Sequence, residues 1–227
     1  MQIAFLLALL ASFVQAAPRD LEQARDRQDR SALERLASAH GAAAAKQAED
    51  ATAQYTHALA QSYLAEVATE LKDKNGGRSA AEVGIKAAEK AVALKPATAE
   101  YHRILGTLCG QVIPASVLAG LKYGRCALDS INKAIELNPK SAMAYVSRGV
   151  GSYYLPSAFG GGADVAVQDL QKAIQLDPKL ADAHLWMGLA LRKLNRNSEA
   201  HAAISKSLQL NPNRLWTKQQ LEKTPAK

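Results

Sequence analysis

The 227-residue sequence has few aromatic side chains, since two Trp, seven Tyr and three Phe make up only 5% of it. Aromatic rings supply much of the buried area in most protein cores. The core is therefore expected to consist mainly of Ala, Leu, Val and Ile, drawn from a composition that is 48% hydrophobic. Ala and Leu are strong helix formers, so this composition favours helices.

Glycine, proline and cysteine are also scarce, with 14, 8 and 2 residues. These counts exclude collagen-like, low-complexity and disulfide-dense proteins. The charged fraction of 22% and the regular apolar spacing argue against global disorder. After the N-terminus no apolar run approaches the ~18 residues of a membrane span, so no spanning helix is expected in the mature chain.

The longest apolar run, residues 3–14, lies at the N-terminus and is interrupted only by Ser12. It is shorter than the roughly 20 residues that a membrane-spanning helix needs. Val14-Gln15-Ala16 then places small residues at the −3 and −1 positions of a signal-peptidase site. We expect residues 1–16 to be a signal peptide cleaved near Ala16, which predicts a periplasmic or otherwise secreted protein. A buried N-terminal helix is the alternative.

Basic residues are concentrated in the second half of the chain. Residues 1–100 contain 12 Lys and Arg against 13 Asp and Glu, whereas residues 101–227 contain 16 against 8. The positive electrostatic field of the second half attracts anionic partners, for example an acidic peptide, a carboxylate ligand or lipid head groups. A solvated basic surface without a partner is the alternative. No nucleic acid is expected as a partner, because the basic residues are dispersed and form no run.

One sequence motif, typical of the end of an amphipathic helix that is followed by proline, occurs four times. It reads AVALKP at 91–96, AIELNP at 134–139, AIQLDP at 173–178 and SLQLNP at 207–212. Proline lacks a backbone N–H and cannot continue a helix, so each occurrence of the motif predicts a helix end. The four prolines are separated by 43, 39 and 34 residues. A period of 34 residues is typical of the tetratricopeptide helix-turn-helix repeat.

Small residues recur at corresponding positions before each proline. A tight helical hairpin needs them where the backbones of its two helices approach. From the last unit to the first they are Gly188, Ala200 and Ser207; Gly149, Ala166 and Ala173; Gly106, Ala127 and Ala134; and Ala60, Gly84 and Ala91. Residues 181–213 resemble the tetratricopeptide repeat (TPR) at nearly every marked position, and the earlier units resemble it with longer loops. This resemblance implies an all-α, right-handed TPR superhelix (α-solenoid) of antiparallel helix pairs.

The repeats divide the chain into segments. After the signal we expect an N-terminal helical cap (17–50), a divergent TPR-like hairpin (51–96), a TPR unit with an extended loop (97–140), a unit with a Gly-rich loop (141–180), a further unit (181–214), and a C-terminal capping helix and tail (215–227). Trp216 is expected to cover the last hairpin, because a terminal repeat cannot bury its apolar face alone. The pattern Ser79-Ala-Ala-Glu82 after Asn75-Gly76-Gly77 predicts a turn and then a helix start, and Gly41 predicts a helix break.

Two segments resemble narrower groups of TPR proteins. Ala99-Glu100-Tyr101-His102 and Leu108-Cys109-Gly110-Gln111 resemble part of the regulator-of-microtubule-dynamics family. The loop Leu155-Pro156-Ser157-Ala158-Phe159-Gly160-Gly161-Gly162 is similar to one found in periplasmic TPR proteins, including the T-components of TRAP-type transporters.

Motifs of enzyme active sites are absent from the sequence. It contains no H-E-x-x-H, no G-x-S-x-G, no P-loop and no Rossmann glycine pattern. The histidines in the repeats stand singly, without the i, i+4 pairing that suits a metal. We therefore predict no enzyme activity, no cofactor and no metal site.

The two cysteines, Cys109 and Cys126, fall on the two predicted helices of one hairpin. Export would place them in an oxidising compartment, where a disulfide persists. A bridge closing this loop would stabilise the fold by about 3 kcal/mol if unstrained. Two small buried thiols are the alternative.

The TPR resemblance also implies a binding groove, lined by the first helix of each hairpin. Its geometry places these residues toward the groove: Arg103, Thr107, Val146, Val150, Tyr153, Leu185, Leu189 and Arg192. The family's carboxylate clamp uses Lys and Asn at matching positions. Here Arg103 and Thr107 replace the first pair and Val146 and Val150 the next, so clamp-type binding of acidic C-terminal tails is not expected. An apolar floor flanked by Arg suits an amphipathic helix or an extended peptide, unless the protein's own N-terminal helix fills it.

These features predict a non-catalytic, exported scaffold that binds a protein or peptide partner, with anionic partners among the candidates, in a concave groove. The alternative is a small-molecule-binding or transporter-accessory protein. That alternative requires a closed pocket for a small hydrophobic ligand around Tyr153, Phe159 and Trp186.

Overall fold

The computed structural model describes residues 18–113 and 117–226, and every regular element within these ranges is helical. The expected signal peptide, residues 1–16, lies outside the described residues. No helix among the described residues is both long and apolar enough to cross a membrane. The helices are α1 (Arg19–Asp26), α2 (Arg30–Lys46), α3 (Ala51–Glu70), α4 (Lys74–Leu94), α5 (Ala99–Val112), α6 (Val117–Leu137), α7 (Ala142–Tyr154), α8 (Ala163–Leu176), α9 (Ala181–Lys193), α10 (Asn197–Leu210) and α11 (Leu215–Glu222), with a 3-10 turn at Ser157–Phe159.

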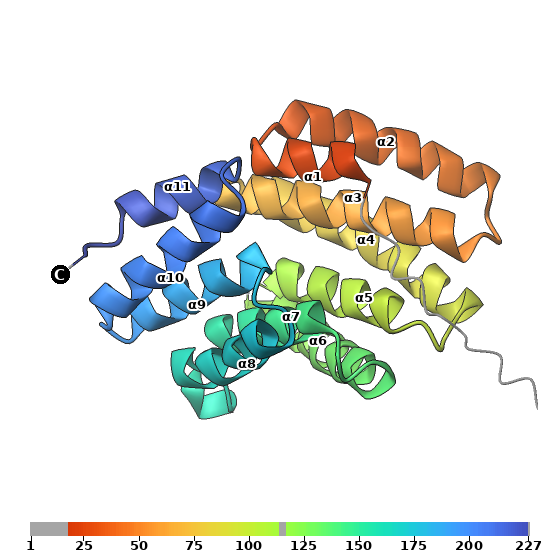
Figure 1. Cartoon of the computed structure of the whole chain (residues 1–227). Coiled ribbons are helices and arrows are strands. Elements are labelled where there is room, and N and C mark those ends of the chain that lie inside the picture. The colour runs from red at the N-terminus through yellow and green to blue at the C-terminus, as the bar shows by residue number, and fades with distance from the viewer. Residues whose placement is uncertain (1–17, 114–116, 227) are drawn as a thin grey trace, which may run out of the picture.

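The helices stack as successive antiparallel pairs (Figure 1). α3 pairs with α4, α5 with α6, α7 with α8, and α9 with α10. The first helices of neighbouring pairs, α3, α5, α7 and α9, also touch one another in order. The all-α solenoid of helix pairs expected from the repeats is thereby confirmed.

Glycines lie where the two helices of a pair approach most closely. A Cβ atom at Gly188 would lie 2.8 Å from the Ala200 carbonyl oxygen across the α9–α10 pair. A Cβ atom at Gly106 would lie 2.9 Å from the Ala127 carbonyl oxygen, and one at Gly149 would lie 2.9 Å from Leu170 Cγ. Real Cβ contacts do not come this close, so glycine permits the spacing of each pair.

The first repeat differs from the sequence prediction at its turn. α4 begins at Lys74, because Asp73 is its N-cap and accepts a hydrogen bond from the Gly76 N–H at 2.9 Å. Gly76 and Gly77 therefore belong to the first turn of the helix, and the predicted turn followed by a helix start at Ser79 is wrong. The carboxylate of Asp73 satisfies one of the free N–H groups of this first turn, which lets the helix begin earlier in the chain.

Gly41 does not break a helix either, because α2 continues from Arg30 to Lys46. A Cβ atom at this position would lie 3.1 Å from Nε2 of His57 on α3. The glycine therefore brings α2 close to α3, and packing of the two helices outweighs its low helix propensity.

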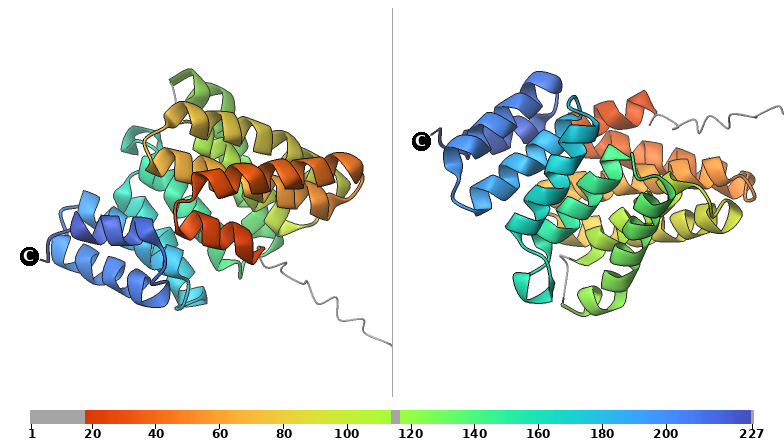
Figure 2. Two further views of the ribbon diagram at one scale, coloured as in Figure 1. Left: turned by 90° about the horizontal axis from the view of Figure 1, so that it is seen from above. Right: turned by 60° about the horizontal axis from the view of Figure 1, so that its bottom comes forward.

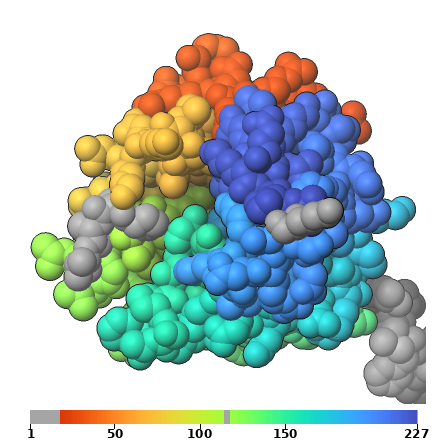
Figure 3. Space-filling model, turned by 90° about the vertical axis from the view of Figure 1, so that its left-hand side faces the viewer, coloured from red at the N-terminus to blue at the C-terminus, as the bar shows by residue number. Residues whose placement is uncertain are grey.

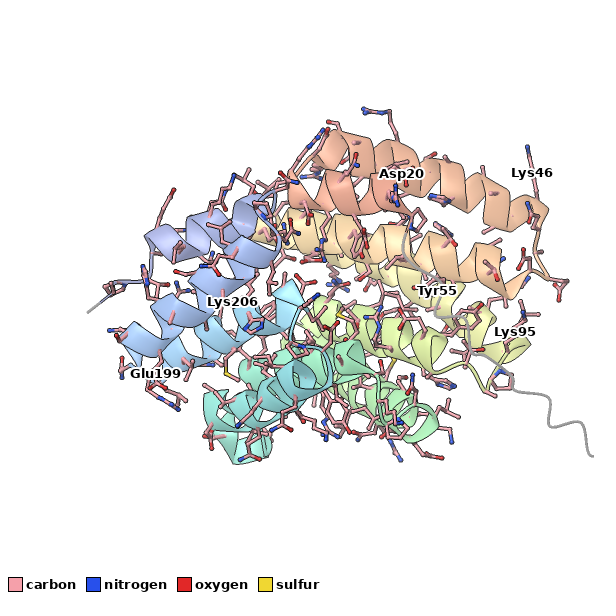
Figure 4. All side chains as sticks on the ribbon, in the orientation of Figure 1. Asp20, Lys46, Tyr55, Lys95, Glu199 and Lys206 are labelled. Carbon is pink, nitrogen blue, oxygen red and sulfur yellow. A yellow bond between two sulfur atoms is a disulfide. The ribbon has the colours of Figure 1, made fainter. Side chains whose placement is uncertain are left out.

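A disulfide joins α5 and α6. Cys109 and Cys126 are bonded, with their Cα atoms 6.0 Å apart, and the pair is visible as a yellow bond in Figure 4. The structure therefore holds the bridge rather than two buried thiols. Cys109 is fully buried in the core shared by the first six helices.

The two ends of the array meet. Figures 2 and 3 show the C-terminal helices α9 to α11 curling back beside the N-terminal cap. Asn211 Nδ2 donates a hydrogen bond to Asp26 Oδ2 at 2.8 Å, and Gln219 Nε2 donates one to Gln28 Oε1 at 3.0 Å. The superhelix is therefore closed across its inner side, which decides how much of that side a partner can reach.

Candidate functional site

Half of the residues expected to line the groove are not accessible. Val146, Leu185 and Leu189 are buried with at most 4% of their surface exposed, and Arg103 is buried as well. Thr107, Val150, Tyr153 and Arg192 are half-buried. The stacked first helices of the pairs bury these four side chains, so this part of the expected groove lining is not open to a partner.

The side chain of Arg103 takes part in a hydrogen-bond network within the protein and does not face a ligand. Its Nε donates to Glu100 Oε2 at 2.7 Å, and its Nη1 lies 3.4 Å from Ser147 Oγ on α7. Tyr55, labelled in Figure 4 where α3 faces α5, donates to the same Glu100 carboxylate at 2.9 Å. This network ties three consecutive first helices together, so Arg103 supports the stacking of the repeats.

Arg192 holds the C-terminal segment. Its guanidinium donates to Gln220 Oε1 at 2.9 Å and to Thr224 Oγ1 at 2.8 Å. These contacts fix α11 and the residues after it against α9. Both arginines expected to flank the groove are therefore engaged within the chain.

A cluster of charged residues from both ends of the array lies on the inner side. Arg25 of α1 donates to Asp182 of α9 at 3.0 Å, and its guanidinium carbon lies 5.0 Å from the centre of the Tyr63 ring on α3. The N-terminal helix thus reaches across to the last repeat. This contact corresponds to the alternative in which the protein's own N-terminal segment takes up part of the groove.

Arg214, just before α11, is the centre of this cluster. Its side chain is almost completely buried, and it donates to the Arg25 carbonyl oxygen at 3.0 Å and to Glu66 Oε1 at 2.8 Å. It also forms an ion pair with Glu70, which is only 4% exposed. One guanidinium therefore links the last helix to α1 and α3. We call Arg25, Asp26, Glu66, Glu70, Asp182 and Arg214 the closing cluster.

The closing cluster shifts the titration of two of its carboxyl groups. Burial and the neighbouring Glu66 raise the pKa of Glu70 to about 7, against the opposing effect of Arg214. Burial would likewise raise the pKa of Asp182, but Arg25 and Arg214 hold it below its usual value. The difference arises because Glu66 and Glu70 share one guanidinium, whereas Asp182 faces two.

Four aromatic rings form a second cluster, on α7, α9 and α11. Tyr153 packs edge-on against Tyr154 and Trp186, with ring centres 5.0 and 5.7 Å apart, and Trp186 lies 5.5 Å from Trp216. Trp216 packs against the core of the last pair as expected. Tyr154 is 53% exposed, so the cluster presents aromatic surface to solvent. We call these four residues the aromatic cluster.

The pocket expected around Tyr153, Phe159 and Trp186 is not formed. The rings of Tyr153 and Trp186 are in contact with each other, while Phe159 is 75% exposed on the turn before α8. Two shallow cavities of about 290 and 420 Å³ lie elsewhere, the first beside α2, α3 and α4, the second beside α1 and α2. Neither is lined by a residue of the aromatic cluster.

Two histidines bind backbone carbonyl groups at the ends of repeats. His102 Nε2 lies 2.8 Å from the Pro96 carbonyl oxygen, and His184 Nε2 lies 2.9 Å from that of Pro178, so equivalent histidines bind the prolines that close two repeats. Burial and the nearby His40 lower the pKa of His57. Within the described ranges, no three His, Cys, Asp or Glu residues are grouped as metal ligands would be.

Sequence reasoning did not identify the closing cluster. Its members come from five places separated by up to 189 residues, and each taken alone is an ordinary charged residue of a helix or turn. No local pattern distinguishes Arg214 from the exposed arginines. Of the aromatic cluster, the sequence analysis named Tyr153 as a groove residue, Trp186 as part of a closed pocket and Trp216 as the cover of the last hairpin, but it did not predict that these rings pack together.

Comparisons with known proteins agree with this architecture. Residues 20–155 match the family described as Regulator of microtubule dynamics protein 1-3, and residues 163–195 and 181–214 match TPR repeat families. No curated protein matches the sequence significantly.

Among solved structures, the chain is similar to TTC0263, a thermophilic TPR protein from Thermus thermophilus, with a TM-score of 0.62 and 18% identity over 92% of this chain and 98% of that one. PilF from Pseudomonas aeruginosa aligns with a TM-score of 0.48 and 21% identity over 68% and 67% of the two chains. The likeness to TTC0263 supports the fold and nothing beyond it.

Proposed function

Since the chain belongs to the Regulator of microtubule dynamics protein 1-3 family and carries TPR repeats, we propose that it is an exported, non-catalytic scaffold that binds a protein partner through the aromatic cluster. A role as a protein-interaction scaffold is what the TPR fold suggests in general. The export and the position of the binding surface are our proposals.

The observation that carries this proposal is the half-exposed Tyr154, backed by three further rings. Tyr and Trp are the side chains that most often dominate protein interfaces, because they bury a large rigid surface at low entropic cost. Lys193 lies beside them, with its ammonium 4.6 Å from the centre of the Tyr153 ring. The surface therefore suits an apolar or aromatic side chain of a partner that also offers a carboxylate to Lys193.

The inner groove itself is a poorer candidate. A peptide bound along it would have to displace the closing cluster, whose charges are already paired within the chain. Breaking buried ion pairs is costly unless the ligand replaces every partner. A partner at the aromatic cluster needs no such rearrangement.

The binding proposal is tested by capture of partners from the cell envelope with wild-type protein and with Tyr154→Ala. The control is Leu128→Ala, which removes an exposed apolar side chain from α6. Partners should be lost with Tyr154→Ala and kept with Leu128→Ala, as measured by quantitative mass spectrometry. Equal recovery with both variants contradicts the assignment of the surface.

Export is tested separately, by the mass of the protein recovered from the envelope fraction. We expect its first residue to be Ala17. Protein that retains residues 1–16 and is recovered from the cytoplasm contradicts export. The family is named for the regulation of microtubule dynamics, and we do not extend that activity to this chain.

A further inference from the structure

Exposed apolar side chains gather at the turns that join the two helices of each pair. Leu118 and Leu121 at the start of α6 are 75% and 79% exposed, and Phe159 is 75% exposed. Leu71, Leu155 and Leu194 occupy the other turns of this kind and are also exposed. At the opposite turns, which connect one pair to the next, Leu215 is the one comparable residue in the described chain. We call Leu71, Leu118, Leu121, Leu155, Phe159 and Leu194 the apolar edge.

The apolar edge lies on one side of the molecule. Figure 3 shows this side of the molecule. The α3–α4 turn, the start of α6, the α7–α8 turn and the α9–α10 turn all lie on it. The start of α6 and the α7–α8 turn lie side by side both there and in the right-hand view of Figure 2. The three most exposed residues, Leu118, Leu121 and Phe159, therefore belong to neighbouring segments. A group of large exposed apolar side chains marks an interaction surface rather than ordinary solvent-facing protein.

Lysines accompany these apolar residues. Lys72, Lys74 and Lys122 are exposed on the same turns or directly beside them, and none has a carboxylate partner within the part of the chain that the structure describes. Of the acidic residues nearby, Asp73 is paired with Arg30 and Glu199 with Arg196, while Asp164 at the start of α8 is exposed and leaves the three lysines in excess. The apolar edge is therefore both hydrophobic and electropositive.

The opposite turns also carry lysine. Lys46, Lys95, Lys140 and Lys179 lie there beside the exposed acidic residues Asp50 and Asp177, and beside Glu49, which is paired with Lys90. The combination of lysine with strongly exposed leucine and phenylalanine is what distinguishes the apolar edge.

We propose that the apolar edge docks on an anionic membrane surface. Leu118, Leu121 and Phe159 would enter the head-group region of the bilayer, and the three lysines would contact the phosphate groups of anionic lipids. Apolar burial and electrostatic attraction to anionic lipids act together in such peripheral binding. The side chains project from separate turns along one side and do not converge on a pocket, so they suit an extended, deformable surface better than a folded partner. This inference goes beyond the proposed function and does not depend on it.

The proposal is tested by flotation of the protein with phosphatidylcholine vesicles that contain either no phosphatidylglycerol or 30% phosphatidylglycerol. One variant combines L118S, L121S and F159S, and a second combines K72E, K74E and K122E. The matched controls are V83S with L128S, which removes exposed apolar residues elsewhere, and K46E with K95E and K140E on the opposite turns. All substituted side chains are exposed or half-exposed, so the fold is preserved.

We expect wild-type protein to bind the anionic vesicles at least tenfold more strongly than the neutral ones, and less strongly in 300 mM salt. Both edge variants should lose at least tenfold in binding, while both controls bind as the wild type does. Edge variants that bind normally overturn the proposal. So does a loss of self-association or of a captured protein partner without any loss of vesicle binding, because the edge would then be a protein interface.

A reporter on the edge identifies the membrane-contacting surface directly, whether or not the apolar N-terminal run has been cleaved. In F159W, the added tryptophan should shift its emission to the blue on anionic vesicles and be quenched by lipids with brominated acyl chains. Emission that stays unchanged while the protein floats with the vesicles refutes docking through this edge.

Discussion

Arg214 should be the most sensitive single residue for the closure of the array. The Arg214→Met variant keeps an unbranched apolar stem but removes the guanidinium. Glu66 and Glu70 then lose their cation, and the Arg25 carbonyl loses a donor. Removing one partner of a buried ion pair costs about 3–5 kcal/mol, chiefly because a buried charge is left without compensation. We expect the free energy of unfolding to fall by about that amount.

The assay is urea denaturation followed by far-ultraviolet circular dichroism. The matched control is Arg196→Met, which breaks the exposed pair with Glu199 and should leave the midpoint unchanged, since exposed pairs contribute little. Adding Glu66→Gln and Glu70→Gln to Arg214→Met should restore part of the lost stability by removing the unpaired charges. If Arg214→Met is no more destabilising than Arg196→Met, the closing cluster does not hold the two ends of the array together.

Three further predictions concern stability. The pKa of Glu70 is raised from 4.5 to about 7, so between pH 4.5 and 7 the folded state keeps a proton that the unfolded chain has released. The contribution of Glu70 to the free energy of unfolding is therefore greatest below pH 4.5 and falls by up to about 3 kcal/mol as the pH rises to 7. The lowered pKa of His57 makes stability rise with pH in the same range. The measurement is therefore the difference in the free energy of unfolding between wild type and Glu70→Gln across pH 4.5–7. Parallel profiles of the two proteins would contradict the assignment. Gly149→Ala should lower the melting temperature, because the added Cβ meets Leu170, whereas Gly151→Ala on the same helix meets nothing within 4 Å and should raise it; the reverse order would refute the close approach of α7 and α8. Replacing Cys109 and Cys126 by Ala should cost about 3 kcal/mol, and thiol titration of the denatured, unreduced wild-type protein should find no free thiol; two thiols would exclude the bridge.

The fold was largely predictable, because each repeat carries its own signals. Pro96, Pro139, Pro178 and Pro212 each follow a helix end within a few residues, and Gly106, Gly149 and Gly188 lie where the paired helices approach. These signals are local, since a missing N–H or a missing Cβ acts within one hairpin. The helix starts were less predictable where two residues are candidates for the N-cap, as Asp73 and Ser79 are for α4, which begins after Asp73 and contains Ser79.

The candidate site was predictable only in part. The repeat period placed Tyr153 on a first helix and the need for a C-terminal cap singled out Trp216, but the contacts that join these rings through Trp186 were not predicted. Arg103 and Arg192 were expected to flank an open groove, and the structure shows each engaged with partners on other helices. A repeat pattern states which face of a helix points inward, but it does not state whether that inner face is empty.

The sequence alone determined the helical repeats, the hairpin register and the small residues at each seam, because these depend on interactions within about 40 residues. The curvature of the stacked repeats determined which residues from distant parts of the chain meet and which stay exposed. It brings Arg214 to Glu66 and Glu70 and Arg25 to Asp182, and it leaves Leu118, Leu121 and Phe159 uncovered on one side. The contacts that close the array join residues far apart in the chain, and a small rotation added at every repeat determines whether they form.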